Sequence, residues 1–264
     1  MTTIAVIGAG KLGELVLSGL LRADWPVGQL MATTRRPERA TELGERYGIR
    51  TVTNRTAFAE ADVLLIAVKP ADAPQVLTDF GGALPPGRLV VSLCAGLPTS
   101  VFSERLPDGV PVVRVMTNTP AQVGQAMTAI SAGRSVTDEH LALVEDIFRP
   151  LGRTVRVPEA QQDAVTAVSG SGPAYLFLVV EAMVDAGVLL GLPRQTAHEL
   201  AVQTALGAAT MLSESGEQPA SLRAAVSSPG GTTVAAVRQL EVHGVRAAFY
   251  AALEAARNRS RELG

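Results

Sequence analysis

The sequence predicts an α/β protein: an N-terminal doubly wound sheet followed by an all-helical domain. Short apolar runs alternate with helical repeats from Thr3 to Val157, which is typical of consecutive βαβ units. A glycine-rich turn joins the first apolar run to the first helix. No convincing strand follows Pro158. The predicted domains are therefore residues 1–157 and residues 158–264.

Composition narrows the classes of protein to consider. The chain has 264 residues, enough for one large domain or two ordinary ones of about 150 residues. Its net charge of −2 gives no general attraction to nucleic acid or to an anionic membrane. The single cysteine, Cys94, allows no internal disulfide and fits a reducing compartment. Because the chain runs directly into a strand without a signal-peptide pattern, we expect a cytoplasmic protein.

The first strand, Thr3–Ile7, leads into the turn Gly8-Ala9-Gly10-Lys11-Leu12-Gly13, where a helix begins. In a GxGxxG turn of this kind, Gly8 permits the tight bend and Gly10 lets the backbone approach a pyrophosphate. Gly13 allows close packing of the helix on the strand. A GxGxxG between a strand and a helix predicts a Rossmann-type domain that binds a dinucleotide.

The second strand, about Gln29–Thr33, ends without the acid that binds a free ribose 2′-hydroxyl. The chain instead continues Thr33-Thr34-Arg35-Arg36, and hydroxyls with two guanidinium groups suit a 2′-phosphate. The alternative is that the two arginines form a solvated turn. With the glycine turn before them, we predict a preference for NADP(H).

The remaining elements of the first half alternate along the chain. Asn54 is expected to cap a short helix. The predicted helices are Pro37–Tyr47 and Asp138–Leu151, and the predicted strands are Ile49–Thr53, Asp62–Val68, Arg88–Leu93, Pro111–Met116, Gln125–Ser131 and Arg153–Val157. Ligands of such sheets bind outside the carboxyl ends of the strands. Lys69, the segment 94–96 and Asn118 all follow such strand ends. For Lys69, a contact with the cofactor and a solvated strand end are equally open interpretations.

The second half is predicted to be helical and to need a partner. The predicted helical runs are Glu159–Val168, Gly172–Leu190, Pro193–Ser215, Ala220–Val226, Gly231–Glu241 and Gly244–Leu263. Two acids, Glu181 and Asp185, interrupt the longest apolar run and argue against a membrane span. The run Leu176–Val180 is apolar on all sides, which a single helical layer cannot bury. We therefore expect an obligate dimer at least.

Two glycine-rich breaks, Val168–Pro173 and Ser227–Thr233, each precede a helix and carry no acid. Unpaired N–H groups and the helix dipole make such helix starts suitable for a small anion. Taken alone, each break is equally an ordinary helix cap. Together they predict an anion site beside the nicotinamide.

With these stretches in view, the chain resembles the pyrroline-5-carboxylate reductase family almost from end to end. The motifs that carry the resemblance are IGAGKLG, DVLLIAVKP, RVMTNTPAQVGQAMTAI, DAVTAVSGSGPAY, DAGVLLGLPR, QTALGAA and SSPGGTT. The last of these is the family's most specific signature. Two residues depart from the commoner pattern: Thr117 stands where proline is frequent, and Cys94 replaces alanine.

The resemblance implies reduction of 1-pyrroline-5-carboxylate to L-proline with NADPH or NADH, by a nucleotide domain and a helical domain that dimerises. It also implies a homodimer at least, and many members form decamers. The implied cofactor-binding residues are Gly8, Gly10, Lys11, Leu12, Thr33, Thr34, Arg35, Arg36, Asn54, Ala67, Lys69 and Ala95. The implied substrate-binding residues are Ser171, Gly230, Gly231, Thr232 and Thr233.

Thr233 is the candidate catalytic residue. Our hypothesis is that its hydroxyl hydrogen-bonds the imine nitrogen and relays or stabilises the proton that this nitrogen gains. Threonine is a weak acid, so the alternative is that the substrate arrives as an iminium ion and Thr233 only orients it. No metal site is predicted, because His140, His198 and His243 are scattered and no HExxH or paired-cysteine pattern occurs.

Three competing functions stay open at this point. A β-hydroxyacid dehydrogenase shares the nucleotide-domain plan, but it places a catalytic lysine in its helical domain, and no lysine follows Lys69. A reductase of another cyclic imine differs by one methylene, which a pocket discriminates by only about 1–3 kcal/mol. A protein that binds NADP(H) without catalysis leaves the SSPGGTT stretch without a purpose.

Overall fold

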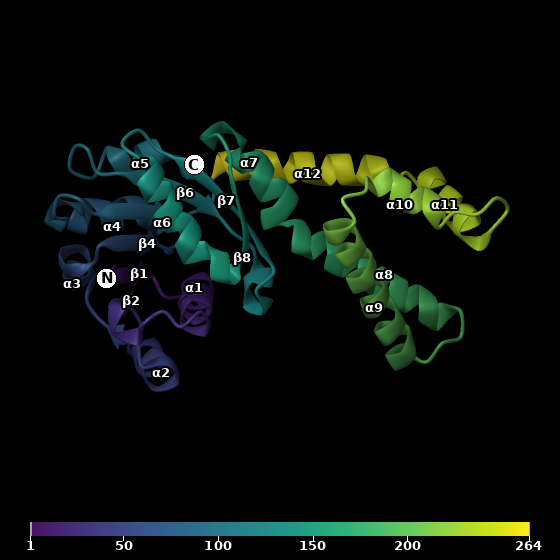
Figure 1. Ribbon diagram of the computed structural model, residues 1–264, viewed down its shortest axis with the longest axis horizontal. Coiled ribbons are helices and arrows are strands. Elements are labelled where there is room, and N and C mark those ends of the chain that lie inside the picture. The colour runs from purple at the N-terminus through teal and green to yellow at the C-terminus, as the bar shows by residue number, and fades with distance from the viewer. Residues whose placement is uncertain (1, 264) are drawn as a thin grey trace. The chain divides into compact units, whose positions relative to one another are not determined.

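The computed structural model describes residues 2–263, which form two compact units (Figure 1). The first unit is Met1–Ser171 together with Ala255–Gly264, and the second is Gly172–Glu254. The chain therefore leaves the first unit once and returns to it. Each unit is considered by itself below.

The described part of the first unit is built on an eight-stranded sheet with the order β3-β2-β1-β4-β5-β6-β7-β8. In chain order the strands are β1 (Ile4–Ile7), β2 (Leu30–Thr33), β3 (Arg50–Thr51), β4 (Val63–Ile66), β5 (Leu89–Ser92), β6 (Val112–Met116), β7 (Ala126–Ala132) and β8 (Gly152–Arg156). The reversal of order between β1 and β4 is that of a doubly wound sheet. The predicted strands are confirmed, with ends that differ by a few residues.

Two strands, β7 and β8, run opposite to the parallel sheet that the sequence predicted. Strands β1 to β6 run parallel, but β7 pairs antiparallel with β6, and β8 then runs parallel to β7. Only the short 3₁₀ turn Thr119–Val123 and its flanks connect β6 to β7. A parallel neighbour needs a crossover of a dozen or more residues, so this short connection produces a hairpin-like reversal.

Helices cover both faces of the sheet because successive strand side chains point to opposite faces. Ile4 and Val6 of β1 belong to one apolar core with α1, α2 and α6, and Ala5 and Ile7 belong to a second core with α3, α4 and α5. The helices of this unit are α1 (Lys11–Arg22), α2 (Pro37–Tyr47), α3 (Asn54–Glu60), α4 (Ala73–Phe80), α5 (Thr99–Ser103), α6 (Asp138–Phe148) and α7 (Gln162–Val165).

The first unit extends past residue 157 because the following segment packs on the sheet. Gln162 is fully buried, and its side-chain amide donates to Ser131 Oγ of β7 at 2.9 Å. The Ser260 hydroxyl, near the end of α12 (Val245–Glu262), donates to Asp163 Oδ1 at 2.8 Å. The compact unit thus includes Ser171, and the division of function at 157/158 stays a prediction.

The second unit is helical, as predicted, and its own core is small. It contains α8 (Gly172–Leu189), α9 (Arg194–Glu214), α10 (Pro219–Ala225), α11 (Thr232–Val242) and the beginning of α12. Its buried apolar cluster consists of Val184, Ala197 and Ala201, with Val180 packed against it. Phe177 on α8 is 67% exposed in the monomer. Such an apolar surface is typical of an interface rather than of a free surface.

One helical run, Glu159–Leu189, is long and apolar enough to cross a membrane by length and composition alone. Its mean hydropathy is 1.5, and 6% of its most apolar window is buried in the monomer. A helix that packs against another subunit has the same composition.

Candidate functional site

The glycine turn between β1 and α1 has the geometry that its sequence predicted. Gly8 has a φ of +87°, and a Cβ there would lie 2.6 Å from Val68 Cγ1. A Cβ on Gly13 would lie 2.8 Å from Val6 Cγ1, so this glycine lets α1 pack on β1. A Cβ on Gly10 would meet nothing within 4 Å. Gly10 therefore leaves its backbone open to an approaching ligand.

The end of β2 holds this turn in place. The Gly8 N–H donates to Thr33 Oγ1 at 3.2 Å, and the Ala9 N–H donates to the Thr33 carbonyl at 2.8 Å. From α2, Arg39 Nε donates to the Ala9 carbonyl at 3.2 Å. Thr33 is thus a structural brace of the turn as well as a lining residue of the pocket beside it.

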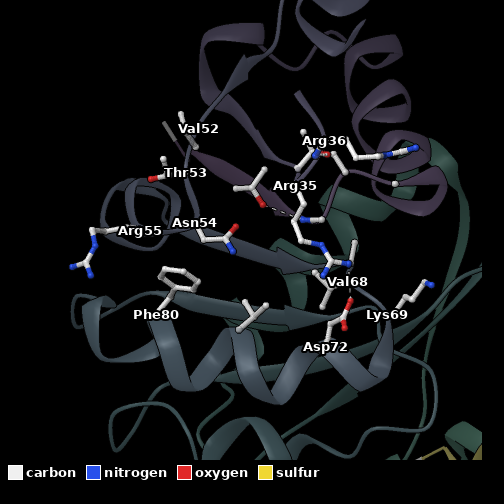
Figure 2. A pocket seen from close by; sticks show the side chains of 17 residues that line it. Arg35, Arg36, Val52, Thr53, Asn54, Arg55, Val68, Lys69, Asp72 and Phe80 are labelled. Atoms are coloured by element: carbon white, nitrogen blue, oxygen red, sulfur yellow. Dashed lines mark hydrogen bonds and ion pairs between the residues drawn. The ribbon is translucent and has the colours of Figure 1, made fainter. Parts of the chain in front are cut away.

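Beside the turn lies a cavity of about 790 Å³, bounded by the carboxyl ends of β1, β2 and β4 and by α3 and α4 (Figure 2). Most of the cofactor-binding residues implied by the sequence line this cavity. Its lining residues are Gly8, Ala9, Gly10, Thr33, Thr34, Arg35, Arg36, Val52, Thr53, Asn54, Arg55, Ala67, Val68, Lys69, Asp72, Val76 and Phe80. An apolar slot with polar groups at its rim suits a nucleoside.

The rim of this cavity carries several cations and one acid. Arg35 and Arg36 follow β2, and Arg55 lies on the opposite side of the cavity from them (Figure 2). Arg35 Nη2 is 3.0 Å from Asp72 Oδ2, and the Arg35 side chain is 85% exposed. Because an exposed ion pair contributes only about 0–1 kcal/mol, Arg35 is free to exchange this carboxylate for a phosphate.

Asp72 is a residue of the site that the sequence analysis missed. An acid was expected only at the end of β2, whereas Asp72 reaches the same cavity from the turn after β4. The available signal was its position three residues after Lys69, just past the carboxyl end of a strand. The apolar residues Val52, Val68, Val76 and Phe80 were also missed, since nothing in their local sequence separates a pocket wall from ordinary core.

Three of the predicted cofactor residues lie outside this cavity. Lys11 is exposed at the start of α1 and lines a neighbouring hollow with Glu14. Leu12 is half-buried against the core beneath α1. Ala95 is half-buried in the segment after β5. Their roles toward a cofactor stay predictions.

The prediction that Asn54 caps α3 was wrong. The capping residue is Thr53, whose Oγ1 accepts the Thr56 backbone N–H at 3.2 Å. Asn54 is the first residue of the helix itself, and the preceding threonine already satisfies the cap. The Asn54 side chain is one of those that line the cavity (Figure 2).

Behind the glycine turn, Glu14 on α1 joins two arginines and a tyrosine. It contacts Arg39, lies 3.1 Å from Arg46 Nη1 and accepts the Tyr47 hydroxyl at 2.8 Å. Burial raises the pKa of Glu14, but the hydrogen bonds from Arg39 and Tyr47 and the nearby positive charges outweigh it, so its pKa is lowered. Glu14 thus stays ionised and engages Arg39, the residue that braces the turn.

Cys94 packs in the core of the first unit. It is 2% exposed, and its Sγ lies 3.5 Å from the Val68 carbonyl. Burial raises the pKa of the thiol to about 12, against a smaller lowering by the Ser92 hydroxyl. Because the thiolate is the nucleophilic form, this cysteine does not serve as a nucleophile near neutral pH.

The predicted substrate residues are divided between the two units. Ser171 ends the first unit and directly follows a π-helical turn, Thr166–Gly170. Its backbone N–H donates to the Thr166 carbonyl at 2.8 Å. π-helical turns are rare and occur frequently at functional sites. The π turn is therefore a second indication, besides the glycine-rich sequence, that this segment has a functional role.

In the second unit, the other predicted substrate residues form a tight turn and a helix start. Gly230 has a φ of +71°, and the Gly231 N–H donates to the Ser228 carbonyl at 3.0 Å. Gly231 is the N-cap residue of α11, and no side chain caps this helix start. Thr232 is exposed and Thr233 is half-buried in the first turn.

The doubly wound sheet, the glycine turn and the phosphate-compatible rim define the class of the protein. It is a dinucleotide-dependent oxidoreductase of the kind that joins a Rossmann-type domain to a helical domain. Two family models cover these parts: NADP oxidoreductase, coenzyme F420-dependent, matches residues 3–96, and pyrroline-5-carboxylate reductase dimerisation matches residues 159–263.

Comparison with individual proteins gives the particular family. The chain is 50% identical to the pyrroline-5-carboxylate reductase of Corynebacterium melassecola, over 100% of this chain and 99% of that protein. The structure of the Coxiella burnetii pyrroline-5-carboxylate reductase superimposes with a TM-score of 0.93 at 36% identity, covering 100% and 98% of the two chains. The Plasmodium falciparum enzyme, crystallised with NADP bound, superimposes with a TM-score of 0.90 at 29% identity, with the same coverage.

The chain belongs to the pyrroline-5-carboxylate reductase family. The resemblance inferred from the motifs is thereby confirmed, and the β-hydroxyacid dehydrogenase reading is set aside. The dimerisation match coincides with the helices that leave Leu176 and Phe177 exposed in the monomer, and it supports a homo-oligomer.

Proposed function

We propose that the chain reduces 1-pyrroline-5-carboxylate to L-proline in the cytoplasm, with NADPH preferred over NADH. The observation that carries the reaction is the 50% identity to a pyrroline-5-carboxylate reductase along the whole chain. The preference for NADPH is supported by the rim of the cavity, where Arg35 and Arg36 follow β2. No acid stands at the end of β2 to accept a free ribose hydroxyl there.

The residues of the first unit would bind and orient the cofactor. The open backbone at Gly10 and the start of α1 suit the pyrophosphate, and Arg35 and Arg36 suit the 2′-phosphate. When bound, the reduced nicotinamide supplies the hydride that adds to the carbon of the C=N bond. The electron pair of that bond passes to the nitrogen, which ends the reaction carrying one additional proton.

The residues of the two glycine-rich breaks would hold the substrate. Ser171 and the backbone N–H groups of Gly230 and Thr232 suit the carboxylate, since an uncapped helix start favours a small anion. The Gly231 N–H closes the turn on the Ser228 carbonyl, and Gly231 would contribute by leaving the approach to the helix start free of a side chain. The Thr233 hydroxyl is assigned to the ring nitrogen, where it donates a hydrogen bond and relays or stabilises the proton.

Replacement of Thr233 tests this assignment. If Thr233 takes part in proton transfer, Thr233→Ala should lower kcat by about 100-fold or more, and Thr233→Ser should restore most of it. If both kcat and KM are unchanged in the alanine variant, Thr233 takes no part in the reaction. A loss confined to KM would mean that it orients the substrate, which then arrives as an iminium ion.

We also propose a homodimer as the minimal unit, with a homodecamer as the larger assembly to test. The support is the apolar surface of α8, where Leu176, Phe177 and Leu178 are each more than 60% exposed in the monomer. Burying this surface needs a second chain. Light scattering coupled to gel filtration would separate monomer, dimer and decamer by mass.

The reaction is tested by the loss of nicotinamide absorbance on adding 1-pyrroline-5-carboxylate, first with NADPH and then with NADH. Rapid oxidation with proline as the product is the expected result. If NADPH is oxidised with a six-membered cyclic imine but not with the five-membered one, the substrate is the six-membered imine. Tight NADPH binding without oxidation of any imine would indicate a protein that binds without catalysis.

A further inference from the structure

The π-helical turn Thr166–Gly170 is held at the carboxyl edge of the sheet. A Cβ on Gly170 would lie 3.3 Å from Met116 Sδ, and Met116 is the last residue of β6. Strand β6 pairs in parallel with β5, so the turn lies at the same edge as the segment after β5. Ligands of doubly wound sheets bind outside this edge.

One side chain connects this edge to the turn by a directed hydrogen bond. Asn118, two residues beyond β6, donates from Nδ2 to the Ser169 carbonyl at 3.0 Å. Its Oδ1 accepts the Met127 backbone N–H at 3.1 Å. Because a backbone N–H can only donate, the amide oxygen must face Met127, and the NH₂ group must then face Ser169.

The orientation of this amide matters because the backbone hydrogen bonds of a π turn differ from those of an α-helix. A π turn forms i to i+5 hydrogen bonds, as the bond from the Ser171 N–H to the Thr166 carbonyl shows. The carbonyl of Ser169 accepts a hydrogen bond from the Asn118 side-chain amide. Asn118 therefore constrains the two residues that directly precede Ser171.

We propose that Asn118 is a positioning residue, which fixes the π turn so that Ser171 is presented to the substrate beside the nicotinamide. The inference rests on the proposed function, since it takes Ser171 as a substrate residue. Asn118 itself needs no contact with the substrate. Its effect passes through Ser169 and the turn, and a misplacement of about 1 Å in a positioning group can cost about 100-fold in rate.

Two variants separate the two hydrogen bonds of Asn118. Asn118→Asp keeps an acceptor for the Met127 N–H but places a carboxylate oxygen against the Ser169 carbonyl. Asn118→Ala removes both bonds. We expect both variants to lower kcat/KM for 1-pyrroline-5-carboxylate by about 10- to 100-fold, while the Kd for NADPH, measured by its fluorescence, stays within about 2-fold.

The matched control is the neighbouring hydroxyl pair of Thr117 and Thr128. The two Oγ1 atoms are 2.9 Å apart and buried, and they hydrogen-bond each other. In the Thr117→Val and Thr128→Val double variant both polar partners are replaced by groups of the same shape, which is nearly neutral for stability. This double variant should keep the wild-type kcat/KM.

Hydrogen exchange gives a readout that does not depend on catalysis. Loss of one hydrogen bond should raise exchange in residues 166–171 by about 5-fold in both Asn118 variants, with no change in the double-valine control. Unchanged exchange there would overturn the proposal even if the protein reduces no imine. Wild-type kcat/KM in Asn118→Asp, or an equal loss in NADPH affinity, would also overturn it. Failure of the wild-type protein to oxidise NADPH with the imine would instead contradict the proposed function.

Discussion

Replacing Arg35 and Arg36 together by serine should convert the cofactor preference while leaving the fold intact. Both side chains are exposed and follow β2 at the rim of the nucleotide cavity (Figure 2). Neither contributes to the apolar cores beneath the sheet. A loss of function in this variant would therefore come from the cavity rather than from unfolding.

The magnitude follows from what each arginine gains and gives up. A hydrogen bond between a guanidinium and a phosphate contributes about 1.5–3 kcal/mol. Arg35 must first leave Asp72, and that exposed pair offsets about 0–1 kcal/mol. A net contribution of about 1–2 kcal/mol from Arg35 corresponds to about 5- to 30-fold in Kd. With Arg36 included, and with both groups screened by solvent, we expect NADPH binding to weaken by about 10- to 100-fold.

The assay is a pair of titrations, NADPH and NADH, followed by nicotinamide fluorescence and repeated as steady-state KM values. NADH lacks the 2′-phosphate, so its Kd should change by less than about 2-fold. Arg55→Ser is the matched control, because Arg55 is an exposed arginine of the same cavity on the side opposite Arg35 and Arg36 (Figure 2). It should leave the ratio of the two affinities unchanged.

An equal loss of affinity for NADPH and NADH in the double-serine variant would refute the reasoning. It would mean that the two arginines stabilise the fold and do not bind the 2′-phosphate. A ratio shifted as much by Arg55→Ser would place the phosphate on the other side of the cavity. The salt dependence provides a further check, because an ionic contact with an exposed phosphate weakens as salt rises.

Three further predictions follow from individual contacts. Asp72→Asn frees Arg35 from its ion pair and should tighten NADPH by about 2- to 5-fold, with no gain in an Arg35→Ser background. Cys94 should resist iodoacetamide at pH 8 until the protein is unfolded, as mass spectrometry would show, because burial raises its pKa to about 12. The pKa of Asp62 is lowered by the Thr3 backbone N–H, against burial, and further by the Thr3 hydroxyl and by Arg88. Because the pKa of this carboxyl is lower in the folded protein, its ionisation stabilises the folded state at pH values above the unfolded pKa of about 3.9. Asp62→Asn should therefore cost about 1 kcal/mol at pH 7, discounted for exposure. The difference in melting temperature should begin to shrink at about pH 4 and should be lost once pH falls below the lowered folded pKa.

The sequence was sufficient for features that depend on local chemistry. The glycine turn was predictable because each of its glycines is needed for a separate steric reason. In the structure, a Cβ at Gly8 or Gly13 would lie too close to a neighbouring side chain, as those reasons require. The helix Pro37–Tyr47 was predicted with its observed bounds, since proline begins it and the glycine that follows, with a φ of +67°, ends it.

The sequence was insufficient where the outcome depends on residues far apart in the chain. The reversal of β7 could not be read from its own apolar pattern, because a strand has the same period of two in either direction. Asp72 pairs with Arg35 across 37 positions, a partnership that only the fold creates. The burial of Gln162 against β7 likewise depends on a polar partner, Ser131, that lies 31 positions earlier in the chain.

The return of α12 to the first unit has a consequence for how the protein is made. Ser260 leaves the ribosome 97 residues after its partner Asp163. At about 5–20 residues per second, that delay is roughly 5–20 s. Throughout this interval the nucleotide-binding unit lacks the segment of α12 that packs on it. Asp163 can pair with the buried Arg114, but it cannot yet accept the hydrogen bond from Ser260. Completion of the first part of the protein is thus a late event of translation, and it follows the synthesis of the whole second unit.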